Sequence, residues 1–120
     1  MATITKAVLS GSTDGRPISI SGTDSTDLIN VHTVSTNTNV IEDVYLWAYN
    51  AASSCAVTVS VTLGASGSDN TIKTVVSPLT DELILPGKSL KGAPSAVVSV
   101  FANEVDLVKI TGHSIIQDQS

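Results

Sequence analysis

Apolar and polar residues alternate along much of the chain. In residues 55–63, which read CAVTVSVTL, valine and leucine alternate with threonine and serine, and no charged residue interrupts the run. Successive side chains of a strand point to opposite faces. The pattern therefore predicts a strand with one apolar face for a core, and one hydroxyl face that can meet water or another protein.

The same period of two recurs throughout the sequence and predicts about eight short strands. We expect them among nine candidate stretches: Lys6–Ser10, Ile18–Ser21, Leu28–Val34, Val40–Asn50, Cys55–Leu63, Thr71–Val76, Asp81–Leu85, Ser95–Ala102 and Asp106–His113. No stretch has the period of an amphipathic helix, and turn residues recur at roughly 8–12-residue spacing, which favours a sandwich or barrel.

The order of these stretches predicts how neighbours pair. Residues 44–63 and residues 95–113 each read as an antiparallel hairpin, the second turning at Asn103-Glu104. Pro86-Gly87 predicts a turn that ends the strand before it, since proline fixes φ and glycine accepts a positive φ. We therefore predict an all-β fold: a single antiparallel β-sandwich over residues 1–120, jelly-roll or immunoglobulin-like, with short polar arms at both termini.

Length, charge and cysteine content narrow the class of protein. The chain has 120 residues, which suggests one domain. A single cysteine excludes an internal disulfide, and the start of the chain does not resemble a signal peptide. Six basic residues are scattered against eleven acidic ones, so we expect no direct contact with nucleic acid. No apolar run approaches the ~18 residues of a membrane span, so we expect no membrane contact.

Three residues could carry chemistry, and we expect none of them to do so. His32 and His113 lie far apart in strand-like stretches and fit partly exposed strand positions better than a catalytic or metal pair. Cys55 has no flanking motif of a nucleophile and fits a small buried apolar residue better. We therefore predict no catalytic residue, no enzyme activity and no cofactor.

Acidic residues in two loops could bind a metal ion. Asp24, Asp27 and Asp69 lie in the stretches GTDSTD and GSDN, neither of which has the spacing of a calcium loop. Aspartate and serine also form turns through hydrogen bonds between side chain and backbone. We expect turn formation and no metal site.

The aromatic residues are concentrated on one strand. In Val40–Asn50, Val44, Leu46 and Ala48 share one face, while Tyr45, Trp47 and Tyr49 share the other. Such a stripe could form a platform for carbohydrate or peptide, but core filling or a subunit interface is commoner. We take Tyr45, Trp47 and Tyr49 as interface candidates and expect Trp47 to be buried, either in the core or in an oligomer interface.

Four stretches resemble, as a set, small β-rich virion proteins of tailed bacteriophages. They are TKAVLSGSTDGRPI, VYLWAYNAASSCAVTVSV, LILPGKSLKG and VKITGH. Some proteins of this kind are capsid cement, or decoration, proteins. The resemblance implies a structural protein made in the host cytoplasm and bound to the outer surface of the head, with the major capsid protein as partner. It transfers no functional residue.

Lattice geometry and the resemblance together suggest a homotrimer, since capsid lattices present local three-fold positions. The alternative is a neck, tail or fibre-associated β-sandwich with an adaptor or host-surface role.

Overall fold

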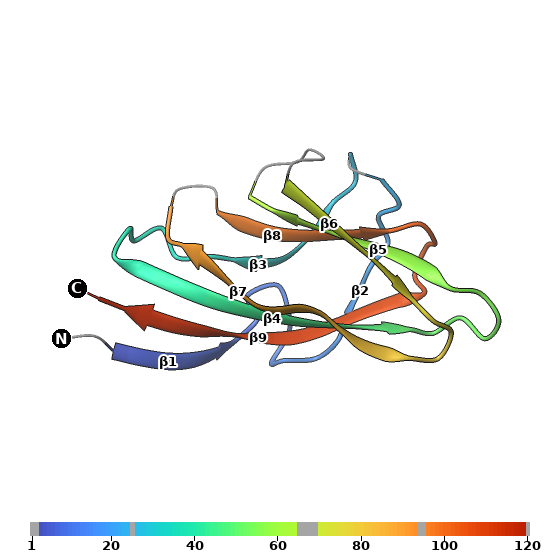
Figure 1. Ribbon diagram of the computed structural model, residues 1–120, viewed down its shortest axis with the longest axis horizontal. Coiled ribbons are helices and arrows are strands. Elements are labelled where there is room, and N and C mark those ends of the chain that lie inside the picture. The colour runs from blue at the N-terminus through green and yellow to red at the C-terminus, as the bar shows by residue number, and fades with distance from the viewer. Residues whose placement is uncertain (1–2, 25, 65–69, 94–95, 120) are drawn as a thin grey trace.

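Strands make up the regular structure of this protein. The computed structural model describes residues 3–24, 26–64, 70–93 and 96–119, and within these ranges there is no α-helix. Figure 1 shows the nine strands: β1 (Thr3–Val8), β2 (Ile18–Ser19), β3 (Ile29–Thr33), β4 (Val40–Asn50), β5 (Val57–Leu63), β6 (Thr71–Val76), β7 (Asp81–Lys91), β8 (Val97–Ala102) and β9 (Val108–Asp118).

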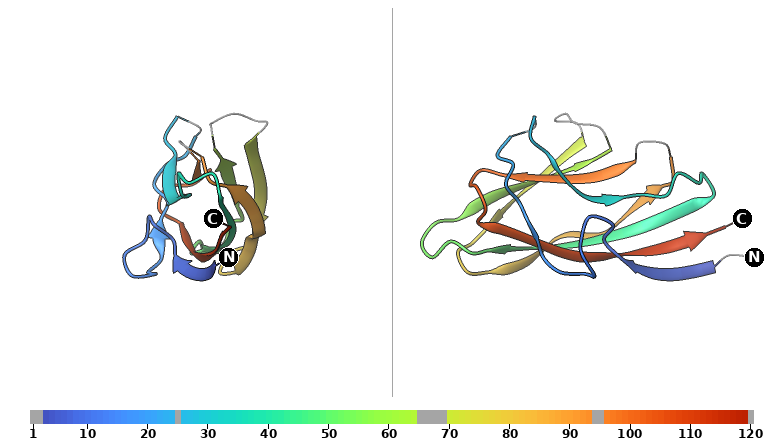
Figure 2. Two further views of the ribbon diagram at one scale, coloured as in Figure 1. Left: turned by 90° about the vertical axis from the view of Figure 1, so that its left-hand side faces the viewer. Right: turned by 180° about the vertical axis from the view of Figure 1, so that it is seen from behind.

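The strands form two antiparallel sheets that pack as a single β-sandwich, as predicted. One sheet, called sheet A here, has the order β1-β9-β4-β7, and the short β2 also pairs with β9. Sheet B has the order β3-β8-β5-β6. This is the order of a jelly roll, in which an antiparallel ribbon is wound so that most consecutive strands lie in opposite sheets. Both termini lie at the same end of the elongated molecule (Figures 1 and 2).

The core lies between the two sheets and consists mainly of β-branched and aliphatic side chains. In β4, burial alternates from residue to residue. Val44, Leu46 and Ala48 share one face, as predicted, and this face is fully buried. In sheet B, Val57, Val59 and Val61 of β5 face them across the core. Because the side-chain period of a strand is two, the other face of β4 points away from the core.

Both predicted hairpins are wrong. β4 pairs with β9 and β7 in sheet A, while β5 pairs with β8 and β6 in sheet B. β8 and β9 are likewise in different sheets. Short connections normally join neighbours in one sheet, but here the chain crosses between the sheets at each of these loops. The Asn50 side chain holds the first crossing by hydrogen bonds to the carbonyls of Cys55 and Val76.

Three strands are longer than expected. β7 continues through Pro86-Gly87 to Lys91, so the predicted turn and the loop after it are wrong. Gly87 is instead the residue skipped in the pairing with β4, a bulge that lets an edge strand accept a proline. The expected polar arms are also largely in strands, because residues 3–8 pair with residues 113–118.

The hydroxyl face of β5 is less accessible than expected. Ser60 and Thr62 point away from the core, yet both are buried. Ser60 lies between two larger neighbours, Lys73 of β6 and Phe101 of β8, in the register of sheet B. Small hydroxyl side chains on a central strand are thus shielded by the longer side chains beside them, and they do not form an open polar surface.

Candidate interaction surface

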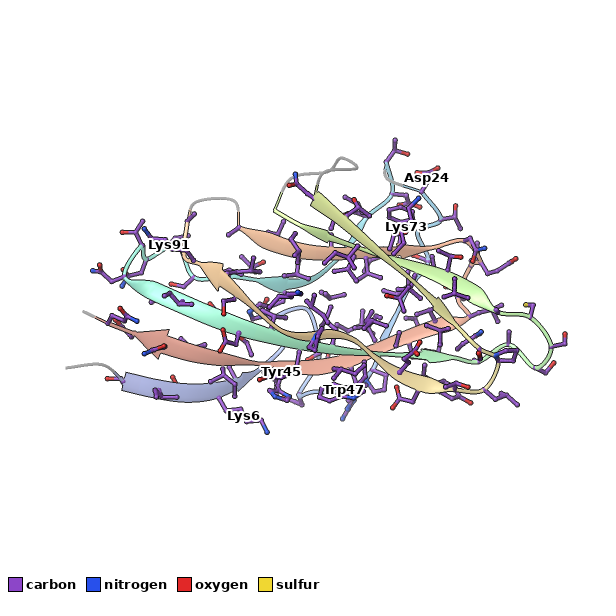
Figure 3. The ribbon with its side chains drawn as sticks, in the orientation of Figure 1. Lys6, Asp24, Tyr45, Trp47, Lys73 and Lys91 are labelled. Atoms are coloured by element: carbon purple, nitrogen blue, oxygen red, sulfur yellow. The ribbon has the colours of Figure 1, made fainter. Side chains whose placement is uncertain are left out.

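The outer face of sheet A carries the aromatic side chains. Tyr45, Trp47 and Tyr49 alternate with the buried residues of β4 and therefore point away from sheet B. Figure 3 shows Tyr45 and Trp47 on the side of sheet A that is turned away from sheet B, with Lys6 of β1 on the same side. In the neighbouring strand β9, His113 lies directly opposite Tyr45.

Three rings form a compact cluster at the centre of this face. The ring centroids of Tyr45 and His113 are 4.9 Å apart, with 21° between the ring planes. Trp47 lies 6.4 Å from Tyr45 and 5.7 Å from His113, again between centroids. Offset-stacked rings at such distances attract each other beyond their area burial. The cluster therefore holds its rings in a fixed arrangement on the surface.

The Gly87 bulge makes room for the Tyr45 ring. Gly87 has φ = 73°, which favours glycine. A Cβ atom at this position would lie 2.8 Å from Cζ and from the hydroxyl oxygen of Tyr45. The ring of Tyr45 thus lies over the backbone of β7, in space that any other residue would partly fill.

Exposed aliphatic side chains surround the ring cluster. Leu83 of β7, which lies opposite Trp47, is 42% exposed, and Val8 of β1, which lies opposite His113, is 54% exposed. We call this surface the aromatic face: Val8, Tyr45, Trp47, Tyr49, Leu83 and His113. An apolar cluster shared by four adjacent strands is typical of an interaction surface, whereas single exposed apolar residues are common everywhere.

Two lysines flank the aromatic face: Lys6 of β1, which acts on His113, and Lys109 of β9, which lies opposite Tyr49. Partial burial lowers the pKa of His113, and repulsion from Lys6 lowers it further. Both effects favour the neutral imidazole. At neutral pH the aromatic face therefore presents an uncharged ring at its centre, with Lys6 and Lys109 at its margins.

Trp47 is not in the core. The expectation that it is buried within the folded chain is wrong, because its position in β4 places it on the outer face, where it is partly exposed. The other option, burial in an interface with a partner, stays a prediction. Tyr49, at the end of the stripe, is more exposed than Trp47.

A buried polar group joins the two sheets. Glu42 is 2% exposed as a residue, and its carboxylate accepts hydrogen bonds from three donors. These are Nε2 of His32 at 2.7 Å, the backbone N–H of Ser35 at 2.8 Å and Oγ of Ser114 at 2.8 Å. Burial alone would raise the pKa of Glu42, but the three hydrogen bonds together lower it. Glu42 is therefore an ionised carboxylate inside the sandwich.

The hydrogen-bond partners of His32 show which of its ring nitrogens carries the proton. Nδ1 accepts a hydrogen bond from the backbone N–H of Ser10, so the proton is on Nε2, which donates to Glu42. Ser114 donates to Glu42 and not to His32, and all three side chains are buried. The three residue types of a catalytic triad are thus present, but no histidine nitrogen is free to activate the serine. The group acts as a structural link between β3, β4 and β9.

The predicted partial exposure of His32 is wrong, and Glu42 was not predicted as a residue of any site. His32 is buried between the sheets and not partly exposed, whereas His113 lies on the aromatic face, so the fold does not bring the two histidines together. Glu42 is on the same strand face as Val40 and Val44. That register was readable from the sequence: a carboxylate on an otherwise apolar strand face requires buried donors.

The remaining candidate residues lie in loops. Cys55 is exposed, so its expected burial is wrong. Asp24 accepts hydrogen bonds from the backbone N–H and the hydroxyl of Thr26, which lower its pKa. The backbone N–H of Asp27 donates to the Asp24 carbonyl. The turn predicted here is therefore present, while Asp69 lies outside the described residues.

The described residues contain neither a metal-binding cluster nor a membrane-spanning helix. Among the described residues, no group of three or more histidine, cysteine, aspartate or glutamate side chains could hold a metal ion. The same part of the chain contains no helix with the length and apolar character needed to cross a bilayer. Comparison of the sequence with protein-family models found no match, and a search of curated proteins also found none.

Proposed function

We propose that this protein is a structural virion protein without enzymatic activity, which binds the outer surface of a tailed-phage head and stabilises it. The observation that carries the proposal is the aromatic face. It is an ordered apolar surface on a rigid sheet, and it is the feature through which a small β-sandwich could hold a large protein partner. The major capsid protein is the proposed partner, and the capsid surface is the proposed location.

The fold and the charge are compatible with this role. Jelly rolls occur in viral capsid and lectin domains, although a fold alone does not define a function. The net charge of −5 would disfavour contact with packaged DNA. The resemblance to phage virion proteins also supports the proposed virion role.

The proposed assembly is a homotrimer. A specific interface buries about 800 Å² on each partner, a substantial part of the 6248 Å² surface of this small chain. Three weak contacts joined in one trimer bind far more tightly than one contact alone. A trimer also matches the local three-fold positions of a capsid lattice.

Co-sedimentation with undecorated heads tests the proposal. Leu83→Lys places a charge beside Trp47 on the aromatic face, whereas Val75→Lys makes the same kind of change at an exposed position on the outer face of sheet B. We expect Leu83→Lys to reduce head binding at least about tenfold, because it buries a charge in the interface. Val75→Lys should bind like the unmodified protein.

Two outcomes would contradict the proposal. If the unmodified protein does not sediment with heads at any concentration, the head is not its partner, and binding to isolated tails would favour the neck, tail or fibre role. If Val75→Lys abolishes binding and Leu83→Lys does not, the contact surface is on sheet B. Circular dichroism of both variants checks that each is folded.

A further inference from the structure

β1 is a strand with little protection from the rest of the molecule. It forms an edge of sheet A and pairs only with β9. Five of its six residues are exposed, and Ala7 alone is partly buried. Exposure of consecutive residues means that both faces of β1 are open, because side chains alternate between the faces. Figure 1 shows β1 at the margin of sheet A, beside the end where both termini lie.

The other sheet edges carry features that discourage pairing. β7 contains a proline and two register shifts. β3 has only five residues and one register shift. β6 has no bulge but is less exposed than β1, with three exposed residues against five, and β2 has only two residues. Bulges, prolines and short strands are the usual means by which proteins block edge pairing. Among the described strands, β1 is therefore the edge most open to an added strand.

The outward residues of β1 define what such a strand would have to match. Ile4, Lys6 and Val8 point to the same side as the aromatic face, since Val8 lies opposite His113. Ile4 is 69% exposed and Val8 54% exposed. The Lys6 side chain makes no hydrogen bond or ion pair with the described part of the chain, while its backbone belongs to the pairing of β1 with β9. The surface therefore presents a lysine between two exposed apolar side chains.

A second copy of β1 fits this surface poorly. Antiparallel pairing that matches Ile4–Val8 with itself places Lys6 opposite Lys6, and like charges opposite each other destabilise a strand pair. Sliding the pairing by two residues avoids this repulsion, but it places each lysine opposite an apolar side chain, Ile4 or Val8. Lys6 thus discourages self-pairing, while it still allows a strand that carries an acidic residue.

We propose that β1 is the acceptor for an extended segment of another protein, which adds to sheet A as a further antiparallel strand. The side chains of this segment that point toward the aromatic side alternate apolar, acidic, apolar, and the acidic residue lies opposite Lys6. Backbone hydrogen bonds supply affinity in strand addition, and alternate side chains supply specificity. Lys6 provides both the attraction for the partner and the repulsion against other copies. This inference does not depend on the virion role.

Two synthetic peptides that differ in one residue test the proposal. Both are seven residues long with capped ends, Thr-Val-Thr-Glu-Thr-Val-Thr and the same peptide with lysine at the centre. Binding to the full-length ¹⁵N-labelled protein is followed by amide chemical shifts. We expect the glutamate peptide to shift the amides of Thr3–Val8, and the lysine peptide to bind about tenfold more weakly, as one reversed charge pair allows.

A charge exchange on the protein completes the test. Lys6→Glu should reverse the preference between the peptides, whereas Lys73→Glu, an exposed lysine on sheet B, should leave it unchanged. Peptides that do not shift the β1 amides, or that bind equally well, would overturn the proposal. So would β1 shifts that grow with protein concentration in the absence of peptide, because the occupant would then be a second copy.

Discussion

Replacing Glu42 by glutamine changes one buried oxygen to an amide nitrogen and leaves the shape of the side chain nearly unchanged. Three donors converge on the carboxylate, from His32, Ser35 and Ser114. An amide has one acceptor oxygen and one NH₂ group, so at least one of the donors would face another donor. His32 cannot adapt by moving its proton, because Nδ1 accepts the hydrogen bond from Ser10.

The size of the effect follows from these contacts. A hydrogen bond to a charged group contributes about 1.5–3 kcal/mol, and a buried donor left without an acceptor costs about 1–3 kcal/mol. The two figures describe overlapping parts of the same change, so we expect Glu42→Gln to lower the free energy of unfolding by about 2–3 kcal/mol. For a chain of this size the melting temperature should fall by about 8–12 °C.

The effect should depend on pH in a defined direction. The folded-state pKa of Glu42 is lowered from its ordinary value of 4.5. Above pH 4.5 the carboxyl is ionised in both states and its stabilisation is complete. The stabilisation is lost as the pH falls through the lowered folded-state pKa. The stability difference between the protein and Glu42→Gln should therefore be full at pH 7 and should shrink below pH 4.5.

Urea unfolding at pH 7 and at the lowest pH where the protein stays folded measures this difference. Glu104→Gln, at an exposed position, is the matched control and should change stability by less than about 0.5 kcal/mol. A difference for Glu42→Gln as small as that of the control, or one that does not shrink at low pH, would refute the reasoning.

Two further predictions concern the aromatic face. Gly87→Ala should destabilise the protein by about 1 kcal/mol more than Gly64→Ala, because both have a positive φ but only Gly87 lies under the Tyr45 ring; equal losses in urea unfolding would contradict the packing. Lys6→Gln should raise the pKa of His113 toward 6.5 without reaching it, since burial remains; an NMR titration that shows no change would exclude Lys6 as a cause.

Strand positions were predictable where a strand alternates clearly between two faces, as in Val40–Asn50, or where turn residues bound it on both sides, as in Thr71–Val76. Val40–Asn50 and Thr71–Val76 have the predicted bounds. In β4 the alternation identified which side chains share a face, and so it found Tyr45, Trp47 and Tyr49 as residues of one face. It did not predict that this face lies outside, because aromatic side chains fit a core as well as a surface.

Strand pairing was not predictable from local patterns. Short loops between β4 and β5, and between β8 and β9, look like hairpin loops, but a jelly roll uses them to cross between sheets. Whether such a loop closes a hairpin or crosses between sheets depends on the pairing energies of strands far apart in the sequence, and a single stretch of residues does not reveal these energies. Pro86-Gly87 was misread for a similar reason, since β7 is an edge strand and can absorb a proline as part of a bulge.

The buried group of Glu42, His32 and Ser114 was not predicted from the sequence for a different reason. Each type alone is commonly exposed, and their burial depends on three strands that meet in space. The register of Glu42 on the apolar face of β4 was the available signal. His113 joined the aromatic cluster only through the pairing of β9 with β4, which the sequence did not predict.

The central claim is that the chain decorates the head of a tailed phage, and quantitative mass spectrometry of purified virions tests it most directly. Heads and tails are separated, and the amount of the chain in each is compared with that of the major capsid protein. The account predicts a high and fixed ratio to the capsid protein in genome-filled heads and none in tails. Absence from the particle, or a few copies confined to the tail, would contradict it.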